Sequence, residues 1–180
     1  MALSMEQPVI IIAMGVSGTG KSTLGSALAE SLGLPFIDGD DLHPPANIAK
    51  MSSGQPLTDA DREPWLALIR ETGVEKVPVV MACSALKRHY RDILRGKDGS
   101  ETEKAPRTYF VYIKGSREVL LDRMQKRQGH FFKADMLDSQ FEALESPEGE
   151  EGVVTVPLEE STEVQVAKAK EELLSMVVDN

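Results

Sequence analysis

The segment from Gly15 to Ser22, GVSGTGKS, matches the phosphate-binding pattern G-x-x-x-x-G-K-[ST] at each fixed position. In such a loop, glycines let successive backbone N–H groups point inward at a phosphate, and the next helix adds partial positive charge at its N-terminus. Lys21 is expected to reach the β- and γ-phosphates, and the Ser22 hydroxyl to bind Mg²⁺ directly. The predicted nucleotide-binding residues are Gly15, Val16, Ser17, Gly18, Thr19, Gly20, Lys21, Ser22 and Thr23.

The setting of this segment, the phosphate loop (residues 15–22), distinguishes it from a glycine-rich turn that matches by chance. An apolar, β-branched run covers residues 9–14 directly before it, and helix-forming residues cover 22–32 directly after it. Strand, loop and helix in that order are the context that the pattern requires. We therefore predict a nucleotide-binding site here.

Two carboxylates follow the next apolar run, in the segment DGDDLHP at residues 38–44. Asp38 and Asp40 are spaced i, i+2 at a strand end, so they point the same way. One carboxylate can hold a water molecule of the Mg²⁺ shell while the other faces a phosphoryl acceptor. Asp38 is the candidate for the metal side, because no strand ends in an obvious Walker-B aspartate. The alternative is an acidic turn in which Asp40 or Asp41 only caps a helix.

A basic segment follows the apolar run at residues 77–82. Ser84 is a predicted helix N-cap, and the N–H groups of the first turn behind it would form an anion site. Lys87 and Arg91 are spaced i, i+4, so they share one face of that helix. A capped surface helix with solvated charges is the alternative. Cys83 is expected to be a small buried hydrophobic residue and not a nucleophile.

A second basic segment, residues 123–133, predicts a lid at about residues 128–140. Arg123 and Arg127 share a helical face, and Gly129 ends the helix. A mobile lid carrying two arginines would close over phosphates and exclude water. The alternative is a charged helix C-terminus that the helix dipole favours. His130 and His43 are candidate general bases, although a lone histidine more often orients a neighbour or is merely exposed.

Apolar runs alternate with helix-forming segments along the chain. This alternation predicts one three-layer α/β domain over residues 1–180, built on a parallel sheet, with ligands at the carboxyl ends of the strands. Residues 145–152 predict an acidic surface turn. The expected strands cover residues 9–14, 34–38, 77–82, 107–113 and 153–156, and the expected helices cover residues 21–32, 41–53, 64–72, 84–95, 116–128, 134–144 and 161–178.

Length and charge bound the possible functions. The 180 residues suffice to bury the core of one domain. A net charge of −9 argues against a nucleic-acid partner, and an anionic substrate would have to be held by local cations. No apolar stretch reaches the roughly eighteen residues that span a bilayer, and residues 1–8 do not resemble a signal peptide. A single cysteine excludes an intramolecular disulfide, so we expect a cytoplasmic protein without a membrane partner.

Taken together, these motifs resemble the small P-loop gluconokinases. The resemblance covers residues 9 to about 144 and is carried by the phosphate loop, residues 38–44, Asn47 with Lys50 and Met51, and residues 56–66, 83–87, 90–92 and 129–131. It implies the P-loop NTPase fold of shikimate and adenylate kinases: a nucleoside-monophosphate-kinase-like domain with a five-stranded parallel sheet in the order 2-3-1-4-5 and a lid. It also implies Mg²⁺-dependent transfer of the γ-phosphoryl group of ATP to the 6-hydroxyl of D-gluconate.

The resemblance implies roles for individual residues as well. Lys21, Arg123 and Arg127 would offset charge on the transferred oxygens. Asp40 would orient or deprotonate the attacking hydroxyl. The candidates for binding gluconate are Asp40, His43, Lys50, Arg62, Ser84, Lys87, Arg91 and His130.

Alternatives remain open at this point. A kinase for shikimate or a nucleoside would share the phosphate loop and the lid, and a non-enzymatic nucleotide switch would share the loop, although the chain has no Asn-Lys-x-Asp guanine signature. Thr58 and Asp61 have capping-box spacing, so a helix start is the alternative interpretation of residues 58–62. Trp65 is expected in the core. The oligomeric state stays open, a homodimer being one alternative.

Overall fold

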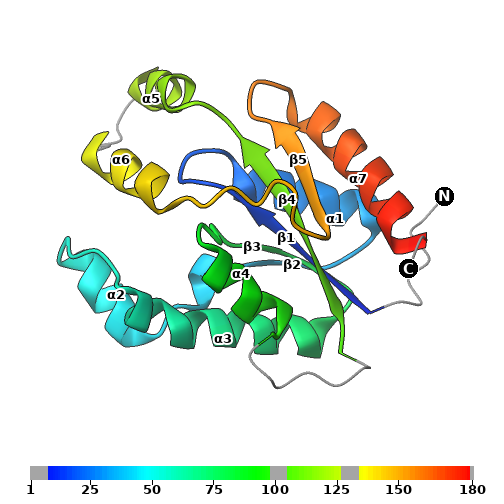
Figure 1. Ribbon diagram of the computed structural model, residues 1–180, viewed down its shortest axis with the longest axis horizontal. Helices are drawn as coiled ribbons and strands as arrows, with labels where there is room; N and C mark the ends of the chain where they lie inside the picture. Colours follow the sequence, from blue (N-terminus) through cyan, green and yellow to red (C-terminus); the bar gives the residue numbers. More distant parts are fainter. Residues whose placement is uncertain (1–7, 98–104, 127–133, 179–180) are drawn as a thin grey trace.

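Five parallel strands form one sheet in the order β2-β3-β1-β4-β5 in the computed structural model, which describes residues 8–97, 105–126 and 134–178 (Figure 1). The order is the one that the resemblance implies. The strands are β1 (Val9–Met14), β2 (Phe36–Asp38), β3 (Val79–Ala82), β4 (Arg107–Lys114) and β5 (Val153–Pro157). All residues of β1 are buried, because helices cover both faces of the sheet. This explains why the strand is apolar throughout and does not alternate.

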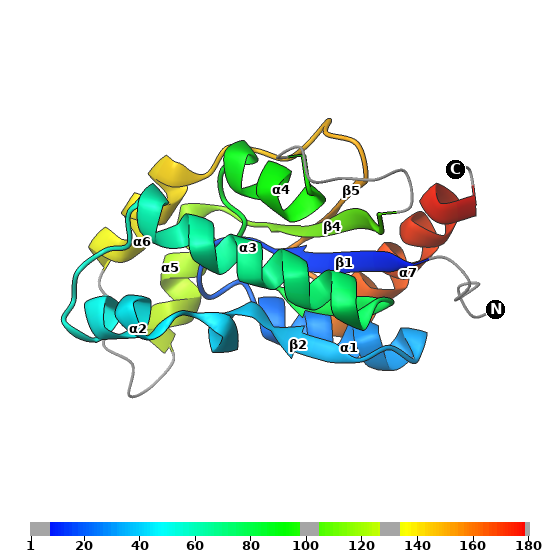
Figure 2. The same cartoon turned by 90° about the horizontal axis from the view of Figure 1, so that it is seen from below.

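The helices lie on both faces of the sheet, so the fold has the three predicted layers (Figures 1 and 2). They are α1 (Lys21–Leu32), the 3₁₀ turn η1 (Gly39–Leu42), α2 (Pro45–Ser52), α3 (Asp59–Lys76), α4 (Arg88–Arg95), α5 (Arg117–Lys126), α6 (Ala134–Ala143) and α7 (Thr162–Val178). Leu28 of α1 and Leu173 of α7 share a core cluster with Ile11. On the other face, Leu66 of α3 packs with Ile10. Among the described residues, no helix has the length and apolar character needed to cross a membrane.

Three helices begin four or five residues from their predicted starts. The predicted helix at 41–53 is split into η1 and α2, because Pro44 is extended (ψ 151°), as expected for a residue that precedes a proline. The predicted helix at 64–72 starts earlier, at Asp59, where Thr58 and Asp61 form a complete capping box. The predicted helix at 84–95 starts later, at Arg88, because Ala85 has a left-handed backbone (φ 48°) that no α-helix contains.

The register of the strands brings the ends of β1, β2 and β3 to one edge of the sheet. Asp38 is aligned with Ala82 of β3, and Ala82 is aligned with Ala13 of β1. Directly after Asp38, a Cβ atom at Gly39 would lie 2.5 Å from the Ala82 carbonyl oxygen, so only glycine fits this close approach. The phosphate loop and the acidic segment 38–41 therefore emerge side by side.

Candidate active site

The phosphate loop connects β1 to α1 in a conformation that depends on glycine. Gly18 (φ 83°) and Gly20 (φ 88°) are both left-handed, and Gly20 is the N-cap residue of α1 without a side-chain cap. The first-turn N–H groups of α1 are therefore left for a ligand, which is the arrangement that binds phosphate. The Thr19 hydroxyl donates to the Val16 carbonyl at 2.9 Å and braces the loop from inside.

Lys21 folds back over this loop. Its Nζ donates to the Val16 carbonyl at 3.3 Å. Desolvation lowers the pKa of the ammonium group, while the nearby carboxylates of Asp40 and Asp38 act in the opposite direction. A partly desolvated cation beside an uncapped helix start gives the loop the positive potential that an anionic ligand needs.

Asp38 and Asp40 occupy different positions at the end of β2. The Ser22 hydroxyl donates to Asp38 Oδ2 at 2.5 Å, and the other Asp38 oxygen accepts from the Asp40 N–H at 3.0 Å. The Asp40 side chain remains solvent-accessible. Desolvation at the base of the site and the Asp38 carboxylate raise the pKa of Asp40, while Lys21 and His43 oppose the shift. Asp38 is thus tied to the phosphate loop, and Asp40 projects beside it.

Trp65 supports the turn that carries Asp40. Its indole N–H donates to the Gly39 carbonyl at 2.8 Å, and the side chain is buried, as predicted. The His43 ring stacks on Trp65 with 4.1 Å between ring centroids. Its Nδ1 lies 3.4 Å from Nδ2 of the buried Asn47. Because an amide nitrogen can only donate, Nδ1 accepts and His43 carries its proton on Nε2. Desolvation lowers the pKa of His43, so the ring is neutral near pH 7.

Four residues from α3, α4 and the turns before them form a polar network next to this pair. Arg62 donates to the Tyr90 hydroxyl at 3.1 Å, and that hydroxyl donates to Asp59. Lys87 donates to the same Asp59 carboxylate at 3.1 Å. Arg62 and Lys87 each lie 5.6 Å from the centroid of the Tyr90 ring. Arg62 and Lys87, both predicted to bind substrate, are therefore brought together by Tyr90 and Asp59. Neither of these two was among the predicted site residues.

Asp59 and Tyr90 were not among the predicted site residues, although the sequence contains one signal that points to Asp59. The capping-box spacing of Thr58 and Asp61 places the start of α3 at Asp59, and hence Asp59 and Arg62 in its first turn. The same box engages Lys50, whose Nζ lies 2.5 Å from Asp61 Oδ2. Lys50 thus lies at the edge of the site with a carboxylate partner already in place.

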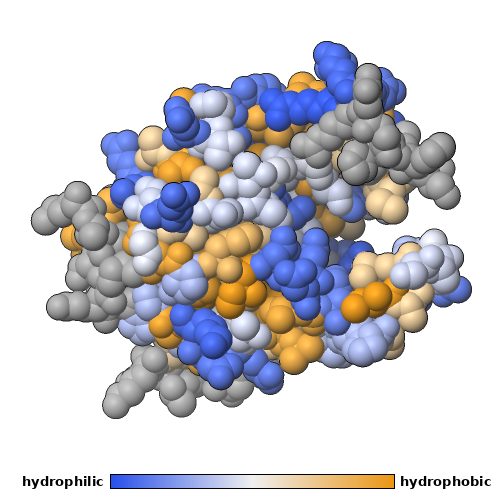
Figure 3. Space-filling model, turned by 180° about the vertical axis from the view of Figure 1, so that it is seen from behind, coloured by the Kyte–Doolittle hydropathy of each residue, from blue (hydrophilic) through white to orange (hydrophobic). Residues whose placement is uncertain are grey.

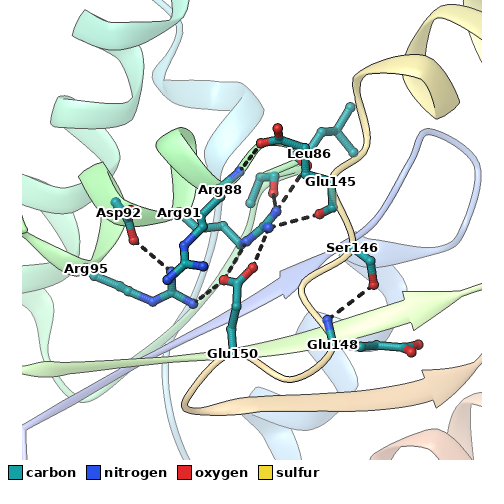
Figure 4. A network of polar contacts seen from close by, with 10 residues as sticks. Leu86, Arg88, Arg91, Asp92, Arg95, Glu145, Ser146, Glu148 and Glu150 are labelled. Carbon is teal, nitrogen blue, oxygen red and sulfur yellow. Dashed lines mark hydrogen bonds and ion pairs between the residues drawn. The ribbon is translucent and has the colours of Figure 1, made fainter.

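Two predictions for the segment after β3 were wrong. Ser84 does not cap a helix: α4 begins at Arg88, and the Arg88 N–H is capped at 2.8 Å by the Glu145 carboxylate (Figure 4). The first turn of α4 therefore holds a carboxylate of the protein itself and offers no anion site for a substrate. Ser84 instead accepts, through its carbonyl, the N–H of Gly15 at 3.3 Å.

Arg91 does not face a substrate either. The side chain is fully buried and ion-paired with Glu150 at 2.7 Å. Because α4 starts at Arg88, four residues later than predicted, Lys87 lies outside the helix. Lys87 and Arg91 therefore do not share the helical face that was expected, and Arg91 is free to point inward. Residues 145–152, predicted as an acidic surface turn, thus direct one carboxylate, that of Glu150, into the interior.

The predicted lid is described only in part. Arg127 and His130, together with residues 128–133, lie outside the described residues. Arg123 of α5 is exposed, and Met124 beside it packs so closely that a Cβ atom at Gly18 would lie 2.2 Å from its Cε. From α6, the Gln140 side chain accepts from the Ser17 N–H at 2.6 Å and donates to the Ser17 hydroxyl at 2.8 Å. Both α5, which precedes the predicted lid, and α6, which overlaps its end, therefore contact the phosphate loop.

The surface is hollowed at this site. Seen from behind, the hollow opens on the side where α2 faces α5 and α6 in Figure 1 (Figure 3). A separate pocket of about 530 Å³ lies at the carboxyl ends of β4 and β5, with Lys114, Ser116 and Pro157 in its lining. In the described part of the chain, no three His, Cys, Asp or Glu side chains converge as a protein-only metal site.

Comparisons with known proteins agree with this geometry. The family model for shikimate kinase matches residues 17–154. A gluconokinase of Gluconobacter oxydans (strain 621H) is 49% identical over 162 residues, which cover 88% of this chain and 87% of that protein. The thermoresistant gluconokinase of Escherichia coli (strain K12) is 44% identical over 168 residues, covering 90% and 91%.

A solved structure extends the similarity to three dimensions. The crystal structure of a gluconokinase from Sinorhizobium meliloti 1021 matches with a TM-score of 0.85 at 47% identity, covering 96% of this chain and 95% of that one. The chain therefore belongs to the gluconokinase family, within the P-loop kinase fold that shikimate kinases share.

Proposed function

We propose that this protein is an ATP-dependent gluconokinase, which transfers the γ-phosphoryl group of ATP to the 6-hydroxyl of D-gluconate and forms 6-phospho-D-gluconate and ADP. One observation carries the proposal: a carboxylate and a cation cluster lie beside a phosphate loop. Asp40 is next to Lys21, and Arg62 and Lys87 meet around Tyr90 on the same side. An acceptor with an alcohol at one end and a carboxylate at the other fits this charge pattern. The gluconokinase relatives support the choice of sugar acid.

We infer the direction in which ATP extends by excluding the side of the sheet that the acceptor would occupy. Its triphosphate would lie on the phosphate loop, so the nucleoside must extend toward one side of the sheet. The side of β2 and β3 holds the acceptor residues Asp40 and Lys87. The base would therefore extend toward β4 and β5, where the pocket lined by Ser116 and Pro157 is large enough for a purine.

Mg²⁺ is proposed as the cofactor, and the residues present fit it. Ser22 Oγ and Asp38 Oδ2 are hard oxygen donors that already converge at the phosphate loop. Mg²⁺ characteristically takes one or two protein oxygens together with phosphate oxygens and water. Ser22 would hold the ion directly and Asp38 through water. When bound, the ion supplies neutralisation of charge on the β- and γ-phosphates.

The protein's part in the reaction is to position groups and offset charge. Asp40 accepts the proton of the 6-hydroxyl as the hydroxyl oxygen bonds to the γ-phosphorus, and the bond from phosphorus to the bridging oxygen breaks to release ADP. Lys21, Arg123 and Arg127 would balance the charge on the transferred oxygens. Contacts from α5 and α6 to the phosphate loop at Gly18 and Ser17 support a lid that responds to the nucleotide.

The acceptor would be oriented by groups on several elements. Arg62 and Lys87 are the candidates for the gluconate carboxylate, with Lys50 at the edge of the site. His43 is neutral with its proton on Nε2, so it is suited to donate to a sugar hydroxyl and not to act as a charged ligand. His130 on the lid remains a further candidate. An ATP-using enzyme whose only cysteine is a buried reduced thiol also fits a cytoplasmic location.

The test is an ATP-consumption assay with gluconate, shikimate and adenosine as acceptors, at varied Mg²⁺. We expect Mg²⁺-dependent turnover with gluconate and identification of the product as a 6-phosphate by NMR. Neutral or differently shaped acceptors would not bring a carboxylate to Arg62 and Lys87 in the same position, so we expect their turnover to be lower by orders of magnitude. Equal turnover of shikimate would overturn the substrate assignment and leave the kinase assignment standing.

A further inference from the structure

We propose that Arg91 is a positioning residue of this enzyme. It holds the loop of residues 83–87, here named the bridging loop, so that one end braces the phosphate loop and the other presents Lys87 to the acceptor. The proposal rests on the proposed function, because it takes Lys87 as an acceptor-binding residue. Arg91 itself would touch neither substrate.

The guanidinium of Arg91 is saturated with directed hydrogen bonds. Its Nη1 donates to the carbonyls of Ala85 (2.8 Å) and Leu86 (3.1 Å). The other donors go to the Glu145 carbonyl (2.9 Å) and to both oxygens of Glu150 (3.0 and 2.7 Å). With five N–H groups engaged and no exposed surface, the side chain has one orientation and no donor left for a ligand. Arg91 therefore acts on the chain around it.

The two carbonyls that Arg91 holds belong to a strained turn. Ala85 has φ 48°, a conformation that residues with a Cβ atom rarely adopt. Such a backbone persists only where surrounding contacts enforce it. The Arg91 guanidinium supplies such a contact, since it donates hydrogen bonds to the carbonyls of both Ala85 and Leu86.

The bridging loop joins the two halves of the site. At its start, the Ser84 carbonyl accepts from the Gly15 N–H at 3.3 Å, and the Cys83 N–H donates to the Ala13 carbonyl at 3.1 Å. At its end, Lys87 reaches Asp59 and lies over the Tyr90 ring. A shift of the turn at Ala85 would therefore move the acceptor-side cation relative to the phosphate loop.

The groups that hold Arg91 from outside the bridging loop come from the distant turn between α6 and β5: the Glu150 carboxylate and the Glu145 backbone carbonyl. Glu150 balances the buried charge, and Glu145 caps the Arg88 N–H while its own N–H donates to the Leu86 carbonyl at 2.8 Å (Figure 4). Arg95 offers a contrast. It pairs with the same Glu150 at 2.7 Å and with Asp92 at 3.0 Å, and neither of these contacts reaches the bridging loop.

Arg91→Lys and its matched control Arg95→Lys separate positioning from stability. Each keeps the charge near Glu150, but a lysine at 91 cannot hold both carbonyls and the carboxylate together. We expect Arg91→Lys to raise the KM for gluconate about tenfold and to leave the KM for ATP within about twofold. The reason is that a displaced Lys87 would weaken the binding of the acceptor and not the binding of the nucleotide. Arg95→Lys should leave both constants within about twofold, even where thermal melting shows a similar loss of stability.

A double-mutant cycle tests whether Arg91 acts through Lys87. In a Lys87→Ala background, Arg91→Lys should add little to the KM for gluconate, because the cation that it positions is gone. Additive effects, or an unchanged gluconate KM in Arg91→Lys, would overturn the proposal. If Arg91→Lys does not fold, Glu150→Gln is measured in its place with the same expectation and the same contrary result. Failure of the proposed function would look different: the wild-type enzyme would not turn over gluconate at all.

Discussion

The Ser22 hydroxyl donates to the Asp38 carboxylate at 2.5 Å and so joins the first turn of α1 to the end of β2. These two elements are not neighbours in the sheet, since β3 lies between β1 and β2. The bond connects the phosphate loop directly to the segment that carries Asp40. It also places two hard oxygen ligands at the position proposed for Mg²⁺.

Asp38→Asn is expected to raise the Mg²⁺ concentration needed for half-maximal activity by about tenfold, because an amide oxygen is a poorer partner for metal-bound water. Activity measured over a Mg²⁺ titration checks this. Asp41→Asn is the matched control, since Asp41 is an exposed carboxylate of the same turn. An equal Mg²⁺ shift in both variants would contradict a specific metal role for Asp38.

Asp40→Asn is expected to lower kcat with gluconate by roughly 10²- to 10⁴-fold, the range for loss of a general base. ATP binding should survive, because the phosphate loop is unchanged; titration of a fluorescent ATP analogue measures it. If this variant weakens nucleotide binding and Asp38→Asn does not, the roles of the two carboxylates are reversed.

The pH dependence of kcat/KM provides a separate test of Asp40. Desolvation and Asp38 raise the pKa of this carboxyl above its ordinary 3.8. Since the ionised form accepts the proton, activity should be full above the raised pKa and should fall as the pH drops through it. We expect this acid limb in the wild type and its absence in the residual activity of Asp40→Asn. An identical acid limb in both proteins would assign it to another group.

Lys21→Met is expected to lower kcat by about 10³-fold or more, because the partly desolvated ammonium acts on the transferred phosphoryl group. Stability should change little, since the methionine keeps the apolar stem and the loop is shaped by backbone and by Thr19. Steady-state kinetics and thermal melting measure the two effects. A variant that retains more than about a tenth of kcat would rule out the proposed role.

Asp61 provides a prediction on stability. Hydrogen bonds from Lys50 and the Thr58 backbone lower its pKa from 3.8 to about 2. A lowered pKa means that the carboxylate stabilises the folded state at neutral pH and that this contribution is lost as the pH falls from about 4 to about 2. Asp61→Asn should unfold at lower urea concentration at pH 7, and the difference from wild type should shrink across that pH range. A constant difference would contradict the assignment.

Local patterns in the sequence predicted the elements proposed to hold the nucleotide. Strand, phosphate loop and helix follow one another without a gap, so their spacing alone placed β1 and α1 at their observed bounds. The burial of Trp65 and Cys83 was also predicted correctly, because both residue types are highly buried on average in folded proteins. The strand order came from the family resemblance and not from periodicity.

The acceptor side required the tertiary structure. Arg91 and Lys87 have the spacing of one helical face, but α4 begins only at Arg88, after the left-handed backbone at Ala85, so Lys87 lies outside the helix while Arg91 is buried within it. What then receives Arg91 is Glu150, which lies 59 positions away in the chain. The periodicity of a helix or a strand cannot predict a partner at that separation in the sequence. Only the packing of the turn after α6 against α4 brings the two charges together. The sequence by itself thus determined the loop proposed to bind phosphate, and the fold decided which cations remain candidates for binding the acceptor.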